Sequence, residues 1–198
     1  MACRGARRHE PPRFTPRLDA AHRALRGGAR PDLVLRRWLD GAALRRAAAL
    51  AANSAYTAAV AERRYGRRVE VVPPGVDEAF FALPLAAGDY ALYVGRLAPE
   101  KDIERLLAWT AGLPFDLVLV GAGEAAYVRR LRALAGPRVR FAGALTGGPL
   151  LAAYAGARFL AFAPHAEEFG LAPLEALAAG KPVLAVPEGG LTELVAHE

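Results

Sequence analysis

The sequence predicts an α/β fold in which a parallel sheet is covered by helices on both faces. Three observations favour this class. After residue 66, short apolar runs alternate regularly with stretches of helical spacing. The runs are almost continuously apolar, which is typical of strands that are buried on both faces. Hydrophobic residues make up 54% of the 198 residues, which is enough for a sizeable core.

Each apolar run is followed by one helical stretch. We expect the strands at residues 90–94, 115–120, 138–141, 159–163 and 182–186, with a further strand before them at 69–72. We expect the helices at residues 103–111, 124–135, 149–156 and 171–179, with another beginning at 191–195. Five such units fit a Rossmann-like open sheet. Because ligands of open sheets bind beyond the carboxyl ends of the strands, the residues just after each strand are the candidate site.

The first third of the chain has a different character. Residues 33–65 carry apolar side chains at helical spacing and form either one helix broken near Gly41 or two helices, the second capped by Ser54. The length allows one domain, or one domain with part of another. We therefore expect a mostly helical segment at residues 1–66 and a Rossmann-like α/β domain at residues 67–198.

Charge is distributed unevenly between these two parts. The whole chain has a formal net charge of +6. Residues 1–68 hold 16 Arg against 5 acidic residues, a net charge of +11, whereas residues 69–198 hold 10 basic and 15 acidic residues, a net charge of −5. Only the first third of the chain therefore has the basic charge that would attract nucleic acid or an anionic membrane. No nucleic-acid motif and no interleaved aromatic residues accompany these Arg residues, so nucleic acid is a disfavoured partner.

Several classes are excluded by what the sequence lacks. No apolar run approaches the ~20 residues that a membrane-spanning helix needs. No apolar stretch follows the charged start, so the sequence does not begin with a secretory signal. The single Cys3 excludes an internal disulfide framework and a cysteine-based zinc site, and the spacing of the histidines supports no metal site. These features together predict a cytoplasmic protein.

Two cations flank the turn after the strand at 90–94. Gly95 allows a tight turn, and Arg96 and Lys101 follow it at the expected ligand-binding edge. A guanidinium fork and an ammonium group together suit a pyrophosphate. The alternative is an ordinary basic pair in a solvated loop. The next strand is followed by Gly121-Ala122-Gly123, which lacks the third glycine of a dinucleotide fingerprint, so nicotinamide binding is disfavoured.

Two carboxylates follow the strand at 159–163. Glu167 lies in the expected loop, and Glu175 lies in the helix that begins near Phe169–Leu171. The free N–H groups at the start of this helix suit an anion, and the two carboxylates can accept hydrogen bonds from hydroxyls on either side of it. The alternative is a pair of surface glutamates. Glu175 stands among apolar residues, however, and a carboxylate there usually has a partner.

Several of these segments together resemble one family. The chain from about residue 50 to 198 is similar to the nucleotide-sugar-binding half of a retaining glycosyltransferase of the GT-B fold, in glycosyltransferase family 4. The resemblance is carried by Gly95-Arg96 with Lys101, Val139-Arg140-Phe141-Ala142-Gly143, Glu167 and Glu175 around Phe169-Gly170-Leu171, Gly180-Lys181-Pro182-Val183, and Gly189-Gly190.

The resemblance implies a donor site for a UDP- or GDP-sugar. Arg96 and Lys101, beside Gly95, would bind the diphosphate and neutralise the charge of the leaving group, so no metal ion or other cofactor would be required. Glu175 would bind the ribose hydroxyls, and Glu167 would act at the donor sugar. The remaining residues implied in substrate binding are Phe169, Gly170 and Leu171 at the sugar and phosphate, Phe141 and Gly143 at the base, and His165, which either touches the donor or is an exposed loop residue.

The sequence also departs from the family pattern. Glu168 stands where the family commonly has Gly, and only about 65 residues precede the region that joins the two halves. The segment around His9 resembles a part of the acceptor domain whose histidine approaches the donor sugar, so His9 is a second catalytic candidate. We expect the chain to be a fragment of a longer enzyme, with a carbohydrate or lipid-linked acceptor and a peripheral contact with anionic membrane.

Other functions stay open at this point. A catalytically inactive nucleotide-sugar-binding module would keep the same donor residues. A phosphorylase or a sugar-nucleotide epimerase can share the GT-B fold. A phosphorylase would need a cofactor-bearing lysine, whereas Lys101 fits a phosphate contact and Lys181 a turn from helix to strand.

Overall fold

The computed structural model describes residues 41–44 and 46–195. Residues from Ala47 onward form one compact unit. His9 and most of the basic first third lie outside the described residues, so the predicted division at residue 66 and the role of His9 stay predictions. In the described part of the chain, no helix is long and apolar enough to cross a membrane.

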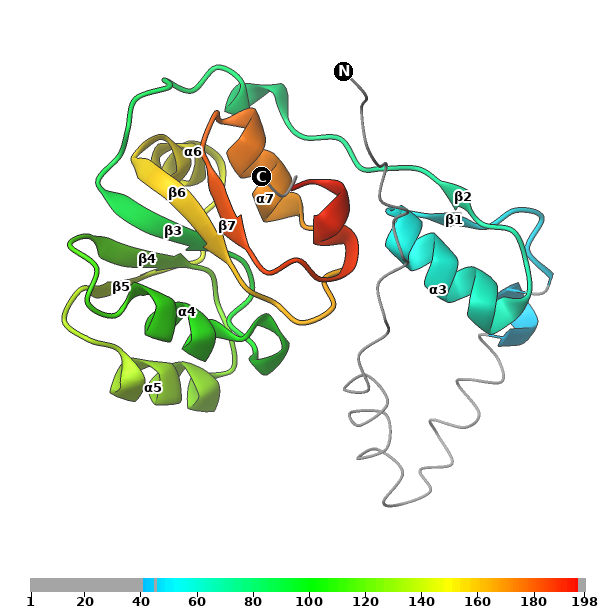
Figure 1. Ribbon diagram of the computed structural model, residues 1–198, viewed down its shortest axis with the longest axis horizontal. Helices are drawn as coiled ribbons and strands as arrows, with labels where there is room; N and C mark the ends of the chain where they lie inside the picture. The colour runs from blue at the N-terminus through cyan, green and yellow to red at the C-terminus, as the bar shows by residue number, and fades with distance from the viewer. Residues whose placement is uncertain (1–40, 45, 196–198) are drawn as a thin grey trace, which may run out of the picture. The chain divides into compact units, whose positions relative to one another are not determined.

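The unit is built on a five-stranded parallel sheet, which confirms the predicted fold class. The strands follow the spatial order β5-β4-β3-β6-β7 (Figure 1). Their bounds are β3 Tyr90–Val94, β4 Asp116–Val120, β5 Val139–Gly143, β6 Ala157–Phe162 and β7 Val183–Ala185. The central strands β3 and β4 are almost fully buried, and β6 is buried at its first residue and over its second half, as their apolar runs predict.

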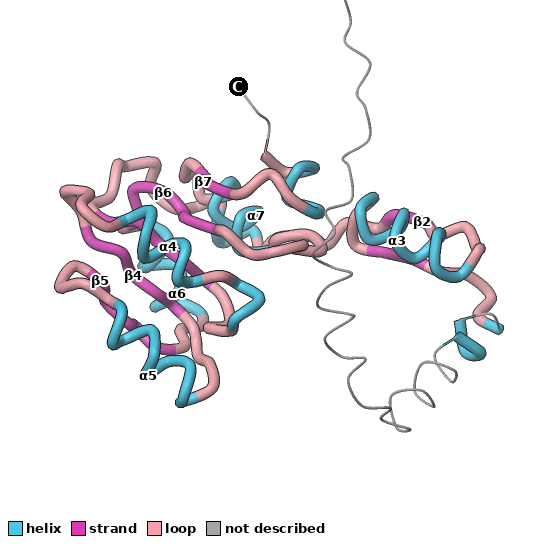
Figure 2. Tube along the Cα trace, turned by 60° about the horizontal axis from the view of Figure 1, so that its bottom comes forward, coloured by secondary structure: helices cyan, strands magenta, loops and turns pink. Residues whose placement is uncertain are grey.

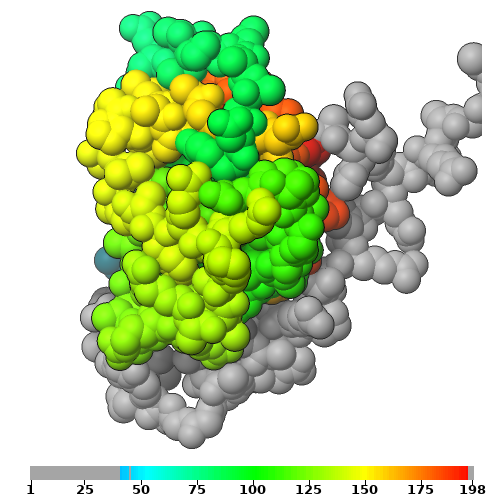
Figure 3. Space-filling view, turned by 90° about the vertical axis from the view of Figure 1, so that its left-hand side faces the viewer, coloured from blue at the N-terminus to red at the C-terminus, as the bar shows by residue number. Residues whose placement is uncertain are grey.

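Helices connect successive strands and cover both faces of the sheet. They are α4 Ile103–Thr110, α5 Ala125–Leu134, α6 Gly147–Ala155 and α7 Leu171–Ala178. The chain moves from β3 through β4 to β5 in one direction and then returns to β6, so right-handed crossovers place α4 and α5 on one face and α6 and α7 on the other (Figures 1 and 2). At the β5 end of the sheet, α5 and α6 both contribute to the surface (Figure 3).

A short segment precedes the sheet. Helix α3 (Ala55–Tyr65) begins at Ser54, whose hydroxyl accepts a hydrogen bond from the Thr57 amide, so the predicted cap is confirmed. The strands β1 (Ala51–Ala52) and β2 (Glu70–Val71) flank α3 in sequence and pair in parallel. The sequence predicted β2 within residues 69–72 but not β1, because two alanines carry no strand pattern.

Two other differences from the prediction lie at turns. The stretch predicted to begin a helix at 191–195 forms instead a 3-10 helix, η3, over Gly189–Glu193. A second 3-10 turn, η2 (Pro99–Lys101), lies between β3 and α4. Both are short, and neither contains enough residues for the helical periodicity that identifies longer helices.

Candidate functional site

The candidate site lies where the strand order reverses. β3 is followed in the chain by β4 on one side of it, but β6 pairs with its other side. The loops after β3 and β6 therefore leave the sheet in neighbouring positions and turn toward opposite faces. Such a reversal leaves a crevice at the carboxyl edge of an open sheet, and ligands bind there. The predicted cations, Arg96 and Lys101, lie on the loop after β3, and the predicted carboxylate, Glu167, lies on the loop after β6.

The loops after β3, β4 and β5 are held together by their backbones. The Gly95 N–H donates to Val120 O at 3.0 Å, and the Gly121 N–H donates to Gly143 O at 2.7 Å. Gly121 has φ 146°, and a Cβ built on it would lie 1.8 Å from the Gly95 carbonyl oxygen. A side chain therefore cannot be accommodated at Gly121 unless these loops separate. The glycines predicted as tight turns bring three strand ends into direct contact.

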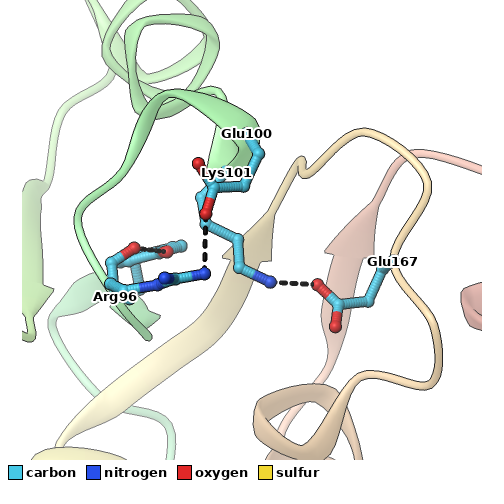
Figure 4. Close-up of polar contacts among 5 residues, drawn as sticks. Arg96, Glu100, Lys101 and Glu167 are labelled. Atoms are coloured by element: carbon cyan, nitrogen blue, oxygen red, sulfur yellow. Dashed lines mark hydrogen bonds and ion pairs between the residues drawn. The ribbon is translucent and has the colours of Figure 1, made fainter. Parts of the chain in front are cut away.

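Lys101 and Glu167 face each other across the reversal point. The Lys101 Nζ donates to Glu167 Oε2 at 2.6 Å (Figure 4). Their side chains are 20% and 15% exposed, so solvent screens this ion pair less than one on the open surface. The two residues come from the loops after β3 and β6, 66 positions apart in the chain. The structure thus brings together one predicted diphosphate ligand and one predicted sugar contact.

Arg96 lies on the same loop as Lys101 but has a different partner. Its guanidinium donates to Glu100 Oε1 at 2.6 Å, and both side chains are well exposed (Figure 4). The Tyr93 hydroxyl donates to the Arg96 carbonyl and fixes the backbone there. An exposed ion pair of this kind contributes little to stability, so Arg96 can exchange Glu100 for another anion at small cost.

The loop after β6 ends at the start of α7. Gly170, with φ 97°, is the residue before the first turn of α7, Phe169 is buried, and Leu171 is exposed. On the inner side of the loop, the Gly190 N–H donates to Glu167 O at 2.8 Å. A Cβ on Gly189 would lie 2.2 Å from the same oxygen. The absence of side chains at Gly189 and Gly190 therefore allows the backbone of the Glu167 loop to pack directly against them.

Glu175 has the buried partner that its sequence context predicted. The Tyr154 hydroxyl of α6 donates to Glu175 Oε2 at 2.6 Å. Burial raises the pKa of the Glu175 carboxyl, and the Tyr154 hydrogen bond lowers it, which offsets part of that effect. Burial and the adjoining carboxylate together raise the pKa of Tyr154. One carboxylate oxygen is thereby fixed, and a hydrogen bond to the other needs no change in the orientation of the side chain.

His165 belongs to a polar cluster beside the Lys101–Glu167 pair. Its Nε2 is 3.0 Å from Asp102 Oδ2, and its Nδ1 is 3.7 Å from Glu188 Oε2. The Arg105 guanidinium is 2.8 Å from Asp102 Oδ2 and 3.3 Å from His165 Nε2. The ring of His165 is thus directed toward charged residues of this chain. From the sequence, His165 was expected either to touch the donor or to be an exposed loop residue. The structure instead shows its ring in contact with charged side chains of the chain itself.

A hollow lies beside the predicted base contacts. It has a volume of about 390 Å³ and is lined by residues that include Gly121, Gly123, Phe141 and Gly143. The Arg132 guanidinium lies over the Phe141 ring, 4.4 Å from its centre, and also lines the hollow. Phe141 and Gly143 therefore border an open, partly apolar space near the strand ends, and their role at the base stays a prediction.

Sequence reasoning missed some members of the site. Tyr154 lies 21 residues before Glu175, and nothing local links the two. Asp102 was detectable in principle, because it directly follows Lys101 at the carboxyl edge of the sheet. Among the described residues, no three His, Cys, Asp or Glu side chains are grouped so that they could hold a metal ion.

Comparison with known proteins places this site in a family. A family model described as "Glycosyl transferases group 1" matches residues 76–198, and one described as "Glycosyltransferase Family 4" matches residues 5–80. The GDP-mannose-dependent alpha-mannosyltransferase of Mycolicibacterium smegmatis is 38% identical over 138 residues, which are 67% of this chain and 36% of that protein. The D-inositol 3-phosphate glycosyltransferase of Nocardia farcinica is 30% identical over 87% of this chain and 45% of its own length.

Solved structures show the same relation. Anabaena HepE in complex with UDP and glucose has a TM-score of 0.65 and 27% identity, over 77% of this chain and 48% of that one. The sucrose-phosphate synthase of Thermosynechococcus elongatus has a TM-score of 0.68 and 30% identity, over 80% of this chain and 45% of that one. This chain spans between a third and a half of the length of these relatives. By its sequence match and its fold, the chain belongs to the glycosyl transferases group 1, glycosyltransferases of the GT-B fold.

Proposed function

We propose that residues 67–198 form the donor-binding half of a glycosyltransferase that moves a sugar from a nucleotide-diphosphate sugar to an acceptor. The observation that carries the proposal is the Lys101–Glu167 pair across the strand-order reversal. It places a cation suited to a diphosphate and a carboxylate suited to sugar hydroxyls next to each other at the edge where open sheets bind ligands. The Anabaena relative, whose structure holds UDP and glucose, is consistent with this class of donor.

The donor would bind by exchanging partners at this pair. Lys101 would turn from Glu167 to the diphosphate, and Arg96 would leave Glu100, its exposed partner, for the same group. Glu167, released from Lys101, would accept hydrogen bonds from the sugar. Both cations would then neutralise the charge that develops as the diphosphate leaves, so the reaction would need no metal ion.

The other half of the nucleotide would lie along α7 and β5. Glu175, with one oxygen held by Tyr154, would accept hydrogen bonds from the ribose hydroxyls through the other. The backbone at Phe169, Gly170 and Leu171 would bind phosphate and sugar oxygens, and the base would enter the hollow at Phe141 and Gly143. A base held mainly by backbone and by one aromatic ring is compatible with UDP and with GDP.

We further propose that transfer retains the anomeric configuration. The bond between the anomeric carbon and the diphosphate oxygen breaks with its electron pair going to the diphosphate. The acceptor hydroxyl oxygen forms its bond to the anomeric carbon on the same face, and the hydroxyl proton passes to the leaving diphosphate. A carbohydrate or a lipid-linked glycan precursor is the proposed acceptor. The cytoplasmic location and the contact of the basic first third with anionic lipid are proposals from the sequence alone.

Donor binding can be tested by calorimetric titration of the chain with UDP, GDP and their hexose conjugates. We expect Lys101→Ala to weaken binding of the preferred diphosphate by about ten- to a hundredfold, because a hydrogen bond to a charged group is lost. Arg138→Ala is the matched control, since Arg138 is exposed and donates to the Pro114 carbonyl at the opposite end of the sheet. Failure to bind any of these nucleotides, or equal binding by the Lys101 and Arg138 variants, would contradict the proposal.

An inactive binding module is the second candidate, because it would bind the donor through the same residues, Lys101, Glu167 and Glu175. The same preparation, incubated with the bound nucleotide sugar, distinguishes the two. Release of nucleoside diphosphate, with or without an added acceptor, supports an enzyme. Stable binding with an intact donor supports the module.

A further inference from the structure

Asp102 directly precedes a helix, but it has an unusual backbone conformation and does not cap that helix. It directly precedes α4 with φ 46°, in the left-handed region that favours glycine. An aspartate at this position normally accepts a hydrogen bond from the first turn of the helix, but the Asp102 side chain makes no such bond. Its Oδ2 instead faces Arg105 Nε at 2.8 Å and His165 Nε2 at 3.0 Å.

His165 reaches the same point from the other side of the reversal. Its backbone N–H donates to the Glu100 carbonyl at 3.1 Å, which joins the loop after β6 to the loop after β3. Its ring then contacts Asp102, two residues farther along the β3 loop. The two loops are therefore joined twice by His165, immediately beside the Lys101–Glu167 ion pair.

Backbone strain occurs on both sides of this contact. Asp102 and Ala166, with φ 46° and 50°, are the non-glycine residues with positive φ in the described part of the chain. The first directly follows Lys101, and the second directly precedes Glu167. Strained conformations persist only where the surrounding structure holds them. The contact joins one strained residue, Asp102, to His165, which directly precedes the other, Ala166, and it can therefore hold both.

We propose that His165 and Asp102 are positioning residues, whose contact sets the distance and orientation of Lys101 and Glu167 at the donor site. The inference rests on the proposed function, since it concerns how the donor residues are held. It gives His165 a role that acts through Lys101 and Glu167, without requiring that its ring touch the nucleotide sugar.

The first test compares variants that remove the contact with variants that keep it. His165→Ala removes the ring but leaves the hydrogen bond from the backbone N–H to the Glu100 carbonyl. Asp102→Gly removes the carboxylate, and glycine tolerates the positive φ at this position. We expect each to weaken binding of UDP or GDP about three- to tenfold in calorimetry. His165→Gln, whose amide can donate to Asp102, should restore most of the affinity. The matched control is Asp116→Asn, because Asp116 pairs with Arg140 at 3.2 Å at the other end of the sheet.

A double-mutant cycle tests whether His165 acts through Lys101. If it does, His165→Ala adds little to the loss already caused by Lys101→Ala, because the residue to be positioned is gone. Full additivity of the two losses would show that the ring contributes independently, and would overturn the inference. So would unchanged affinity in both His165→Ala and Asp102→Gly.

The outcome for the unsubstituted chain separates this inference from the proposed function. If the unsubstituted chain binds neither diphosphate, the proposed function fails and the inference fails with it. If the unsubstituted chain, the Asp116→Asn control and the His165 and Asp102 variants all bind the nucleotide with the same affinity, the proposed function stands and the inference alone is overturned.

Discussion

The two ends of the sheet each hold one of the chain's two lysines, in opposite surroundings. At the amino end, Lys181 is 4% exposed, and its Nζ donates to the carbonyls of Ala86 and Ala155 at 2.8 Å each. At the carboxyl end, Lys101 is partly exposed and pairs with the Glu167 carboxylate. One lysine is satisfied by fixed backbone groups, and the other by a side chain that can rotate.

This difference indicates which end can bind a ligand. One of the carbonyls around Lys181, that of Ala86, lies in the segment that leads into β3, and the other belongs to Ala155, the last residue of α6 before β6, so moving them would disturb the approach to both strands. Glu167 can rotate away from Lys101 without any change in the backbone. An incoming anion can therefore replace the partner of Lys101, whereas Lys181 has a structural role, as the sequence predicted for a turn from helix to strand.

Two glycines at opposite ends of the sheet differ most in the room that they leave for a side chain. Gly121, after β4, has no room for a side chain, whereas a Cβ on Gly136, before β5, would meet nothing within 4 Å. We expect Gly121→Ala to lower the free energy of unfolding by about 3 kcal/mol or more, since it adds both a backbone clash and a strained φ. Gly136→Ala should change it by about 0.5 kcal/mol or less. Urea denaturation of both variants measures this, and similar values for the two would contradict the backbone contacts described at the carboxyl end.

The lysines themselves provide the next comparison. Lys181→Met should lower the free energy of unfolding by about 2 kcal/mol, because the carbonyls of Ala86 and Ala155 lose the charged donor that the buried ammonium group supplies. Lys101→Met should lower it by about 1 kcal/mol or less, since its ion pair is partly solvated. Nucleotide affinity should show the reverse order, with the folded Lys181 variant binding normally. Equal free energies of unfolding and equal nucleotide affinities in the two variants would contradict the distinction between the two lysines.

A smaller effect is expected from Glu175, which lies between the two ends. Burial raises its folded pKa above the unfolded value, so the folded state binds more protons and stability falls as pH rises through this range. Tyr154→Phe removes the hydrogen bond that lowers this pKa, and should therefore steepen the loss of stability as pH rises above 4.5, the ordinary pKa of a glutamate. Urea denaturation at a series of pH values measures the slope. In a chain that also carries Glu175→Gln, Tyr154→Phe should no longer change this slope, and a change that persists there would assign the effect to another group.

The sequence predicted the sheet well because each strand carries its own signal. The strand at 90–94 agrees with β3 at both ends, since a run buried on both faces has sharp limits. The edge strand β7 is shorter than the predicted 182–186 because it has a neighbour on one side only. Local patterns also predicted that Lys101 and Glu167 lie near each other, because the carboxyl ends of parallel strands meet at one edge.

The parts of the site that could not be predicted depend on contacts between distant segments. The sequence placed Arg96 and Lys101 together, but their different carboxylate partners follow from where the β6 loop lies in space. Tyr154 and Asp102 have their roles only through Glu175 and His165, which are distant in sequence. Periodicity and spacing describe one element at a time, and they do not identify which side chains meet across the sheet.

The contacts at the start of α3 have a practical consequence for chimeric proteins. The Ser54 hydroxyl donates to the Glu168 carbonyl, and the Glu193 carboxylate accepts the N–H groups of Ala55 and Tyr56 at 2.9 and 2.8 Å. A recombinant exchange of segments between relatives preserves these native pairings only if its junction lies before Ser54. A junction in the proline-rich turn at residues 73–75 would place the start of α3 and its partners Glu168 and Glu193 on segments from different proteins.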